Sequence, residues 1–323
     1  MIKAPQFWHK KILISFLLLP LSWLYGIAVI WRYLLITPKK INKPIICIGN
    51  LIAGGAGKTP VAIAIGLMLR DKNIDFAYLS YGYGRKSDRF LQVSSSGTSA
   101  IEAGDEPILL SEVYDTFVSS NRVVGAKKIA AMKEKQLIIL DDGFQNPSLF
   151  KDLHILVVDG GYGFGNEFLM PAGPLREPIS FGVRRADLVI IIGEDKANIA
   201  GYFTHKEVVY GKIIPVNNEK FTGKNVIAFC GIGRPEKFFD SLKDVGAQII
   251  KKISYADHYL YSNQDLDYLI SLAREHNAKL VTTKKDWVRI DPQYQDKIEF
   301  LDIKIEFDNP DLVKQKVLNI LQK

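Results

Sequence analysis

Residues Ile45–Thr59 read Ile-Ile-Cys-Ile-Gly-Asn-Leu-Ile-Ala-Gly-Gly-Ala-Gly-Lys-Thr, and this stretch decides the fold of the chain. An apolar run comes first, a glycine-rich stretch follows, and Pro60 then opens a helix-forming run over Val61–Arg70. A strand, a glycine-rich turn and a helix in this order form a phosphate-binding loop, because backbone N–H groups and the positive end of the helix dipole converge on phosphate oxygens. We therefore expect the loop to bind ATP or GTP, with Lys58 on the β- and γ-phosphates and the Thr59 hydroxyl on Mg²⁺.

The glycine spacing of this loop departs from the pattern G-x-x-x-x-G-K-[ST]. That pattern would need a glycine at Ile52, whereas the additional glycines stand at Gly49, Gly54 and Gly55. A glycine-rich loop without any nucleotide is the alternative, and the strand–loop–helix context argues against it. The residues expected to contact the nucleotide are Ile52, Ala53, Gly54, Gly55, Ala56, Gly57, Lys58 and Thr59.

Composition places the chain among ordinary globular proteins. Its 323 residues are 47% hydrophobic and 24% charged, with a formal net charge of +7. A basic balance fits a nucleic acid, an anionic membrane or a phosphorylated substrate, but the chain lacks the aromatic–basic interleaving typical of nucleic-acid binding. Cys47 and Cys230 lie in apolar runs without metal-ligand spacing, so we expect buried thiols in a reducing compartment.

The N-terminal region carries a second apolar signal. Ile12–Trp31 contains no charged residue and has basic residues on both sides. A run of this length would just cross a bilayer core of about 30 Å, but Pro20, Ser22 and Gly26 weaken the helix, so a helix lying on the membrane is equally open. A cleaved signal peptide or a buried core helix are the alternatives. We expect residues 1–35 to associate with the membrane.

After Pro44, short apolar runs alternate with helical runs, as is typical of a mainly parallel α/β sheet. The strands expected in the first set are Ile45–Ile48, Phe76–Ser80, Leu137–Leu140, Ile155–Val158 and Leu188–Ile192. A second set begins near Asn225, with strands at Val226–Cys230, Gln248–Ile253, Lys279–Thr282 and Ile298–Ile303 and helices at Pro235–Val245, Asn263–His276 and Asn309–Leu321.

This pattern predicts an α/β fold of the P-loop NTPase type, with a mainly parallel sheet and helices on both of its faces. Three parts are expected along the chain. Residues 1–35 form the N-terminal hydrophobic helix, residues 36–215 the nucleotide-binding domain, and residues 216–323 a smaller α/β domain that closes over the active site.

Two acidic motifs are placed to serve a phosphate loop. The apolar run Leu137–Leu140 ends in Asp141 and Asp142, and such an acid holds Mg²⁺ in P-loop proteins. Aspartate after a strand is also common turn chemistry, but the phosphate loop favours the metal role. Asp105 and Glu106 begin a helix, where capping alone would explain them. The functional interpretation is a carboxylate that accepts the proton of an attacking hydroxyl group, with its neighbour near the metal.

Two further features carry less specific signals. His258 follows Asp257 in a loop after a strand of the second set, and a lone histidine is more often structural than catalytic. The 160–178 loop is rich in glycine and proline, yet it also contains Phe, Leu and Met. An apolar loop of this length inside a compact fold is usually functional, and beside a membrane helix it would face an amphiphilic substrate.

The chain resembles the tetraacyldisaccharide 4′-kinases, the lipid A kinases of Gram-negative bacteria, over nearly its whole length. The displaced glycines of the phosphate loop are themselves typical of that family. The motifs that carry the resemblance are Pro20–Gly26, Gly49–Pro60, Ser80–Arg85, Gly104–Pro107, Asp141–Gln145, Gly163–Pro178, Asp257-His258 and Thr282–Asp286.

The resemblance implies an enzyme that transfers the γ-phosphate of ATP, with Mg²⁺, to the 4′-hydroxyl of a tetraacyldisaccharide 1-phosphate and so forms lipid IVA. It implies a location at the cytoplasmic face of the inner membrane, in contact with the lipid A precursor and inner-membrane lipids. We expect a monomer that binds no nucleic acid.

The resemblance also implies roles for single residues. Asp105 would be the catalytic base, and His258 would orient it and raise its basicity. The other implied catalytic residues are Lys58, Asp141 and Asp142. The implied metal ligands are Thr59, Glu106, Asp141 and Asp142, and the candidates for acceptor contacts are Arg176, Asn166 and Gly173.

Three positions depart from the family pattern. Tyr81 stands where the family usually has Arg, Glu167 where it has Gly, and Lys284 where it has Glu. We assign no role to these three residues.

The alternative function is a membrane-associated P-loop ATPase that drives positioning, insertion or transport. Such switch proteins use Lys-Gly-Gly-x-Gly-Lys-Thr, whose first lysine acts across a dimer, and Ala53 occupies that position here. A GTPase would need an Asn-Lys-x-Asp motif, which the sequence lacks. A membrane scaffold that binds nucleotide only structurally is the non-catalytic alternative, and the acids at Asp105, Asp141 and Asp142 would then be incidental.

Overall fold

The structure is a computed structural model, and it describes residues 5–95 and 97–322. The chain divides into two compact units. The larger unit comprises Pro5–Thr98, Glu102–Ile213 and the residues from Ile305 onward. The smaller unit comprises Ile214–Lys304 together with Ser99–Ile101.

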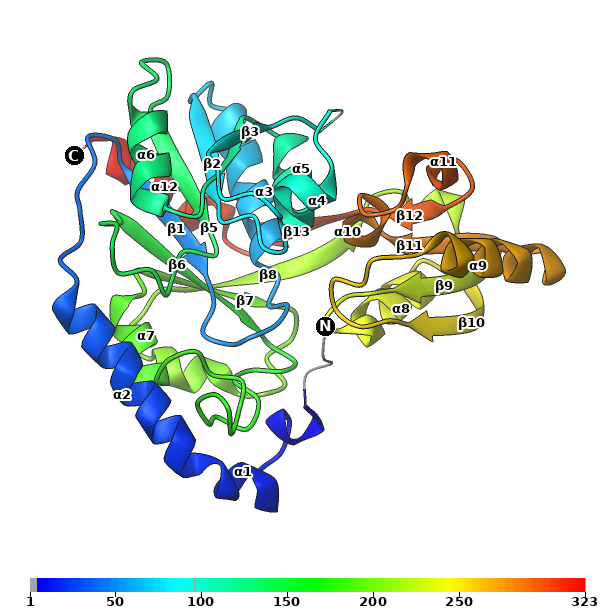
Figure 1. The fold of residues 1–323 in the computed structure, drawn as a ribbon, viewed down its shortest axis with the longest axis horizontal. Coiled ribbons are helices and arrows are strands. Elements are labelled where there is room, and N and C mark those ends of the chain that lie inside the picture. Colours follow the sequence, from blue (N-terminus) through cyan, green and yellow to red (C-terminus); the bar gives the residue numbers. More distant parts are fainter. Residues whose placement is uncertain (1–4, 96, 323) are drawn as a thin grey trace. The chain divides into compact units, whose positions relative to one another are not determined.

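A nine-stranded sheet with the order β13-β8-β7-β6-β1-β5-β2-β4-β3 forms the centre of the larger unit (Figure 1). The strands from β8 to β4 pair in parallel, and β3 pairs with β4 in the antiparallel sense. The strands are β1 (Ile45–Gly49), β2 (Phe76–Ser80), β3 (Leu91–Val93), β4 (Thr116–Val118), β5 (Leu137–Asp141), β6 (Leu153–Asp159), β7 (Leu188–Ile192), β8 (Val208–Pro215) and β13 (Ile303–Phe307).

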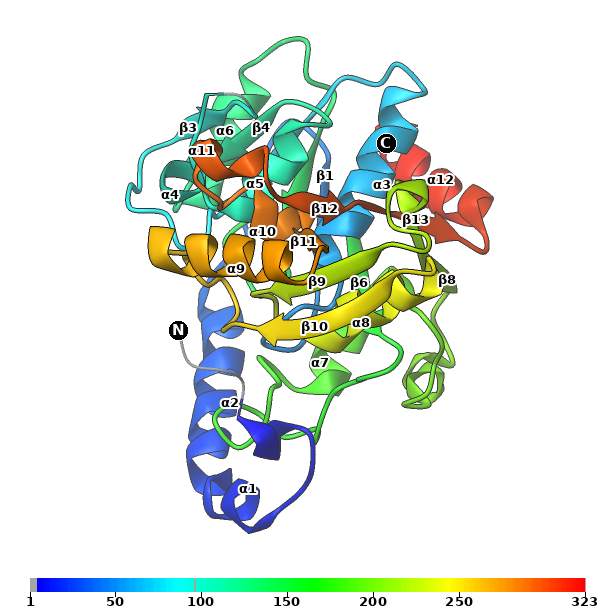
Figure 2. The ribbon, with the colours of Figure 1, turned by 90° about the vertical axis from the view of Figure 1, so that its right-hand side faces the viewer.

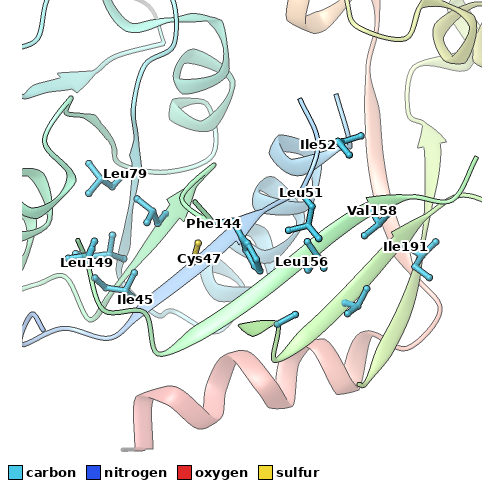
Figure 3. Close-up of a cluster of buried hydrophobic side chains, with 14 of the residues drawn as sticks. Ile45, Cys47, Leu51, Ile52, Leu79, Phe144, Leu149, Leu156, Val158 and Ile191 are labelled. Atoms are coloured by element: carbon cyan, nitrogen blue, oxygen red, sulfur yellow. The ribbon is translucent and has the colours of Figure 1, made fainter. Parts of the chain in front are cut away.

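Helices cover both faces of this sheet. The helices of the larger unit are α1 (Leu13–Leu17), α2 (Leu19–Leu35), α3 (Lys58–Arg70), α5 (Asp105–Ser111), α6 (Arg122–Ala130), α7 (Ile179–Arg185) and α12 (Pro310–Asn319), with short 3-10 turns η1 (Gln6–Trp8), η2 (Ile199–Phe203) and η4 (Ile320–Gln322). The short helix α4 (Ala100–Ala103) has residues in both units. Ile46 and Ile48 of β1 pack with α3, α5 and α12, whereas Ile45 and Cys47 pack with α6 and with Phe144 on the other face (Figure 3).

Central strands that are buried on both faces explain the continuous apolar runs in the sequence. The α/β class and the five strands predicted for the first set are confirmed. The strands β3, β4 and β8 were not predicted. β3 and β4 have only three residues each, which carry too little periodicity, and the burial of the eight-residue β8 is broken by exposed positions.

The C-terminal part of the chain differs from the prediction. Ile298–Ile303 is expected to be one strand of the second domain, but the structure has β12 (Glu299–Leu301) followed by β13, which belongs to the nine-stranded sheet. Val313 and Val317 of α12 then pack into the core of the larger unit. The sequence shows that α12 has an apolar side, but a helical pattern does not say which sheet that side will meet.

The smaller unit contains a parallel four-stranded sheet with the order β10-β9-β11-β12 (Figure 2). Alternate residues of β9 serve opposite faces, since Ala228 packs with Phe239 of α8 and Phe229 packs with Leu266 of α9. The elements are β9 (Asn225–Cys230), β10 (Gln248–Ser254), β11 (Lys279–Thr283), β12, α8 (Pro235–Asp244), α9 (Asn263–Glu275), α10 (Lys284–Trp287), α11 (Pro292–Gln295) and η3 (Asn218–Lys220).

The N-terminal helices α1 and α2 turn their polar and small residues inward. Ser15, Ser22 and Gly26 are buried, and the Ser22 hydroxyl donates to the Leu169 carbonyl at 2.8 Å and accepts from the Ala172 N–H at 3.0 Å. The large apolar side chains face outward, namely Ile12, Leu13, Ile14, Phe16, Leu17, Leu21, Trp23, Leu24, Ile27, Ile30, Trp31, Leu34 and Leu35. Within residues 5–95 and 97–322, no helix combines the length and apolarity that a membrane crossing needs.

Candidate active site

Three adjacent parallel strands end at the same edge of the large sheet. β1 pairs with β5 so that Ile48 lies opposite Asp141, and β5 pairs in turn with β2. The phosphate loop leaves β1, Asp142 follows β5, and the segment leading to Asp105 follows β2. Because ligands of open α/β sheets bind at the carboxyl ends of the strands, this edge is the candidate active site.

The phosphate loop has the backbone that its glycines permit. Gly54 and Gly57 have φ values of +120° and +88°, and Gly57 caps the N-terminus of α3. No described heavy atom lies within 4 Å of the place where a Cβ on Gly54 or Gly55 would stand. This open space, at the positive end of the α3 dipole, fits the phosphate groups of a nucleotide. The Asn50 amide braces the loop by donating to the Gly54 carbonyl at 3.3 Å.

Lys58 and Arg176 meet on the carboxylate of Asp142. The Lys58 ammonium is buried. It lies 3.7 Å from Oδ1 of Asp142 and 3.4 Å from the side-chain amide oxygen, Oδ1, of Asn50. Arg176 Nη1 donates to both Asp142 oxygens, at 3.0 and 3.2 Å. Burial alone would raise the pKa of Asp142, but the charges of Lys58, Arg176 and Arg122 outweigh it and hold this pKa well below its ordinary value.

Arg122 is a site residue that the sequence did not reveal. Its Nη2 donates to the Asp142 carbonyl at 2.8 Å, and its guanidinium lies 5.3 Å from the centre of the Tyr81 ring. Asp142 itself has a φ of +50°, so Arg122 stabilises a left-handed turn directly after β5. Arg122 belongs to none of the motifs in the sequence, so only the fold connects it with the phosphate loop.

Gln145 links the turn after β5 to the phosphate loop. Its Nε2 donates to the Asn50 carbonyl at 2.7 Å and to Glu177 at 2.9 Å. Glu177 is completely buried and pairs with Arg185 at 2.8 Å, and burial raises the pKa of Glu177. Gln145 stands in the motif Asp141–Gln145, which is the signal that pointed to it, but sequence reasoning had given it no role.

Asp105 begins α5 and is only 4% exposed. Its Oδ1 accepts a hydrogen bond from the Glu106 N–H at 2.9 Å, but the N-cap of α5 is Gly104, so Asp105 does not cap this helix. Gly104 has a φ of +89°, and a Cβ there would lie 2.9 Å from the Tyr83 carbonyl. The Ser80–Arg85 segment therefore packs directly against the turn that presents Asp105 and Glu106.

The three acceptor candidates of the 160–178 loop separate into two groups. Arg176 reaches the phosphate loop, where its backbone N–H donates to the Leu51 carbonyl at 2.8 Å. The Asn166 amide is buried and donates to the carbonyls of Phe7 and Ala172, and a Cβ on Gly173 would lie 2.0 Å from Asn166 Oδ1. Asn166 and Gly173 shape the loop by these contacts, and their contact with the acceptor stays a prediction.

His258 lies in the smaller unit, in the loop after β10. Its N–H donates to the Gly231 carbonyl at 3.0 Å, and its Nε2 lies 3.4 Å from the Lys285 ammonium. The fully buried Asp286 accepts from the Gly231 N–H at 2.9 Å and from the Tyr261 hydroxyl at 2.8 Å. These two bonds tie the loop after β10 to Gly231, which follows β9. Because Asp105 belongs to the larger unit, the proposed pairing of Asp105 with His258 stays a prediction.

The oxygen ligands at this edge fit Mg²⁺ better than they fit a transition metal. Thr59 supplies a hydroxyl, and Asp141 and Asp142 supply carboxylates. Among the described residues, no group of three or more His, Cys, Asp or Glu side chains could hold a metal by itself. Proteins usually hold Mg²⁺ by one or two carboxylates together with substrate phosphates and water.

The comparisons with known proteins agree over nearly the whole chain. Residues 14–322 match the family described as Tetraacyldisaccharide-1-P 4′-kinase. The tetraacyldisaccharide 4′-kinase of Rhodospirillum rubrum is 40% identical over 316 residues, which is 95% of each chain, and that of Rickettsia typhi is 37% identical over 317 residues, or 97% of each chain.

A solved structure supports the same assignment. The crystal structure of LpxK from Aquifex aeolicus in complex with ATP superimposes on this chain with a TM-score of 0.79 and 29% sequence identity. The match covers 96% of this chain and 100% of the LpxK chain. The sequence resemblance is therefore confirmed by family, by relatives and by fold. The chain belongs to the tetraacyldisaccharide-1-P 4′-kinase family, and it is an enzyme of that family.

Proposed function

We propose that this protein transfers the γ-phosphate of ATP to the 4′-hydroxyl of a tetraacyldisaccharide 1-phosphate, giving lipid IVA at the cytoplasmic face of the inner membrane. One observation carries the proposal: Lys58, Asp142 and Arg176 meet beside an open phosphate loop in a chain of this kinase family. The relatives bear the name of this activity, and the related LpxK crystal structure is a complex with ATP.

The roles of the residues follow from their placement. The backbone of residues 52–57 would hold the nucleotide phosphates, and Lys58 would stabilise the negative charge that develops on the transferring phosphoryl group. Thr59, Glu106, Asp141 and Asp142 would hold Mg²⁺. The bound Mg²⁺ would supply positive charge to the phosphate oxygens.

The acceptor side of the reaction needs a base. The Asp105 carboxylate would accept the proton of the 4′-hydroxyl as the new oxygen–phosphorus bond forms, and His258 would assist it. Arg176 would leave Asp142 in part and contact phosphate oxygens, because it already lies beside Lys58. Asn166 and Gly173 would act indirectly, by holding the loop that carries Arg176.

Membrane association is proposed on the outer face of α1 and α2. Thirteen large apolar side chains face outward there, whereas Ser15, Ser22 and Gly26 face the protein. This is the reverse of the pattern of a helix on a soluble protein, where the apolar side turns inward. A helix with such a face lies in the interfacial region of a bilayer and places its protein beside lipid substrates.

The experiment that tests the function uses ATP labelled on its γ-phosphate. Purified protein is incubated with tetraacyldisaccharide 1-phosphate in detergent, and we expect the label on the disaccharide lipid. The Lys58→Ala variant should transfer at least a hundredfold less, because lost stabilisation of charge in the transition state typically costs 10²–10³ in rate. Lys72→Ala, an exposed lysine after α3, serves as the control.

Two results would contradict the proposal. Wild-type-like turnover by Lys58→Ala would remove the assigned role of the phosphate loop. Release of free phosphate without labelled lipid would favour the membrane-associated ATPase instead. Ala53, where such ATPases have their first lysine, donates its backbone N–H to the Pro174 carbonyl at 2.8 Å.

A further inference from the structure

A pocket of about 720 Å³ in the larger unit is lined by residues of α2, of α7, of the 160–178 loop and of the turn after η2. Its walls are mostly apolar and include Leu19, Trp23, Leu169, Ile179 and Val183. This volume is in the range of pockets that bury small molecules, about 300–1,000 Å³. Half of the lining residues carry polar side chains, but most of the lining surface is apolar, so the pocket fits a hydrocarbon chain better than a sugar or a nucleotide.

The rim of the pocket is positively charged. Arg184 and His205 are exposed there, and Lys206 joins them with its ammonium donating to the Ala186 carbonyl at 2.7 Å. The one acid in the lining, Glu167, already pairs with Lys11 at 2.8 Å and accepts from the Tyr202 hydroxyl. An apolar interior with a cationic rim is complementary to an acyl chain that carries an anionic headgroup.

The pocket is continuous with the apolar outer face of α1 and α2. Trp23 belongs to both, since it lines the pocket and is 64% exposed. If that face lies in the bilayer interface, as proposed above, an acyl chain can pass from the bilayer to the pocket without crossing water. The inference therefore rests on the proposed membrane association.

The pocket is separate from the phosphate site. Leu175 lines the pocket, whereas the next residue, Arg176, extends to Asp142 beside the phosphate loop. Neighbouring side chains of an extended segment point in opposite directions, so the 160–178 loop forms a wall between the two sites. Among the described residues, the lining contains no member of Ile45–Thr59 and neither acid that ends β5.

We propose that this pocket binds one acyl chain of an anionic bilayer glycerophospholipid, with the headgroup phosphate against Arg184 and His205. Such a lipid does not react. It fills the space between α2 and α7, beside the 160–178 loop.

The test uses the full chain in detergent micelles that contain phosphatidylglycerol, and mass spectrometry counts the phosphatidylglycerol that stays bound to each protein. Wild type should retain one molecule. Val183→Trp places an indole in the pocket, and retention should weaken by about fourfold for each methylene group that the indole displaces. Leu34→Gln, on the outer face and outside the lining, should retain the lipid like wild type.

A second variant keeps the test valid if Val183→Trp does not fold. Arg184→Gln changes only an exposed side chain, and it should lose the preference for phosphatidylglycerol over phosphatidylcholine. Kinase turnover in detergent reports the folding of both variants and should stay at the wild-type level.

Three results decide the proposal. Equal retention by wild type, Val183→Trp and Arg184→Gln would overturn it. Displacement of phosphatidylglycerol by tetraacyldisaccharide 1-phosphate, together with a raised KM for that acceptor in Val183→Trp, would assign the pocket to the substrate and also overturn it. Failure of the wild type to sediment with phosphatidylglycerol vesicles would contradict the proposed membrane association, while retention from micelles would still report on the pocket.

Discussion

Asp142 shows how single side chains organise the phosphate site. Its carboxylate stands between Lys58 and Arg176, and its carbonyl accepts from Arg122. A charge-assisted pair of this kind is stronger than a neutral hydrogen bond, and the loss of one partner leaves the other charge poorly compensated. The Asp142 carboxylate is therefore held in its ionised form, which can pair with a cationic side chain or with Mg²⁺.

The first prediction concerns the pH dependence of stability in Arg176→Gln. In the wild type, the lowered pKa of Asp142 contributes stability that is present above the unfolded-state pKa of about 4 and is lost as the pH falls through the folded-state value. Arg176→Gln moves this pKa back towards its ordinary value. We expect the variant to be less stable by about 1 kcal/mol at pH 7, because it loses one charge-assisted hydrogen-bonded pair.

Thermal denaturation of the wild type and of Arg176→Gln at pH 7 and at about pH 3.5 checks this prediction. The lower pH lies just below the ordinary aspartate pKa of about 4. The difference between the two midpoints should shrink at the lower pH, where protonation begins to cancel the contribution of the pair. Arg184→Gln, an exposed arginine, is the matched control and should show no such change. A difference that stays the same at both pH values would show that Arg176 stabilises the fold by packing alone.

At the scale of elements, the 160–178 loop is a packed structure, although its composition suggests a flexible one. Ser22 of α2 bonds to Leu169 and Ala172, and the Tyr25 hydroxyl donates to the Arg176 carbonyl at 3.1 Å. The loop thus connects the N-terminal helices with the phosphate site. Deletion of residues 1–32 would remove these bonds together with the proposed membrane-binding face of α1 and α2. Substitutions on that outer face therefore test membrane binding more cleanly.

The second prediction concerns Gly173→Ala. The new methyl group would lie 2.0 Å from Asn166 Oδ1 and 2.4 Å from the Phe168 carbonyl, so the loop must shift. Such overpacking costs about 1–3 kcal/mol, and the shift would also displace Arg176. We expect a lower denaturation midpoint together with reduced kinase turnover.

Gly201→Ala is the matched control for this variant, since no described heavy atom lies within 4 Å of its Cβ position. It should retain both the midpoint and the turnover of the wild type. A Gly173→Ala variant with unchanged stability would mean that the loop accommodates the methyl group by an easy rearrangement.

The third prediction concerns the outer face of α1 and α2. Leu17, Leu24 and Leu34 are 70%, 64% and 78% exposed, so a triple change to Gln removes few packing contacts within the protein. Burial of a leucine in an apolar environment contributes about 1.5–3 kcal/mol, so binding to lipid vesicles should fall by at least a hundredfold. Vesicle sedimentation measures this binding, and turnover in detergent should be unaffected.

The corresponding control is Leu260→Gln in the smaller unit, where the side chain is 65% exposed. It should bind vesicles like the wild type. Equal binding by the triple variant and the wild type would show that another surface holds the protein on the membrane.

At the scale of the whole molecule, the proposed reaction needs residues from both compact units. Asp105 belongs to the larger unit, whereas His258 is built into the smaller unit by Gly231 and Asp286. Residues that act together in one catalytic step show non-additive effects when both are removed. The pairing of Asp105 with His258 can therefore be tested by kinetics.

The fourth prediction is a double-mutant cycle with Asp105→Asn and His258→Ala. Each single variant should lower kcat, since general base catalysis typically contributes 10²–10⁴-fold, and the double variant should be little worse than Asp105→Asn. Binding of ATP should persist in all three, because the phosphate loop is unchanged. Multiplicative losses would show that the two residues act independently, and full turnover by Asp105→Asn would show that Asp105 is not the catalytic base.

The sequence by itself determined the features that depend on neighbours along the chain. Glycines next to Lys58 predict a phosphate loop because backbone freedom and a helix dipole are local properties, and the apolar run before Asp141 predicts a buried strand for the same reason. The five strands expected in the first set, β1, β2, β5, β6 and β7, and the α/β class were therefore correct. The family motifs also pointed to the kinase family that the comparisons confirmed.

Only the tertiary structure decided which distant residues meet. The parallel pairing of β1 with β5 brings Asp142 to Lys58. Arg122, which belongs to no sequence motif, and Gln145, to which sequence reasoning assigned no role, join them there. The packing of α12 against the large sheet and the packing of Asn166 also depend on residues that are distant in the chain. Contacts between residues far apart in the chain follow from the register and the packing of the whole core, which a local pattern does not contain.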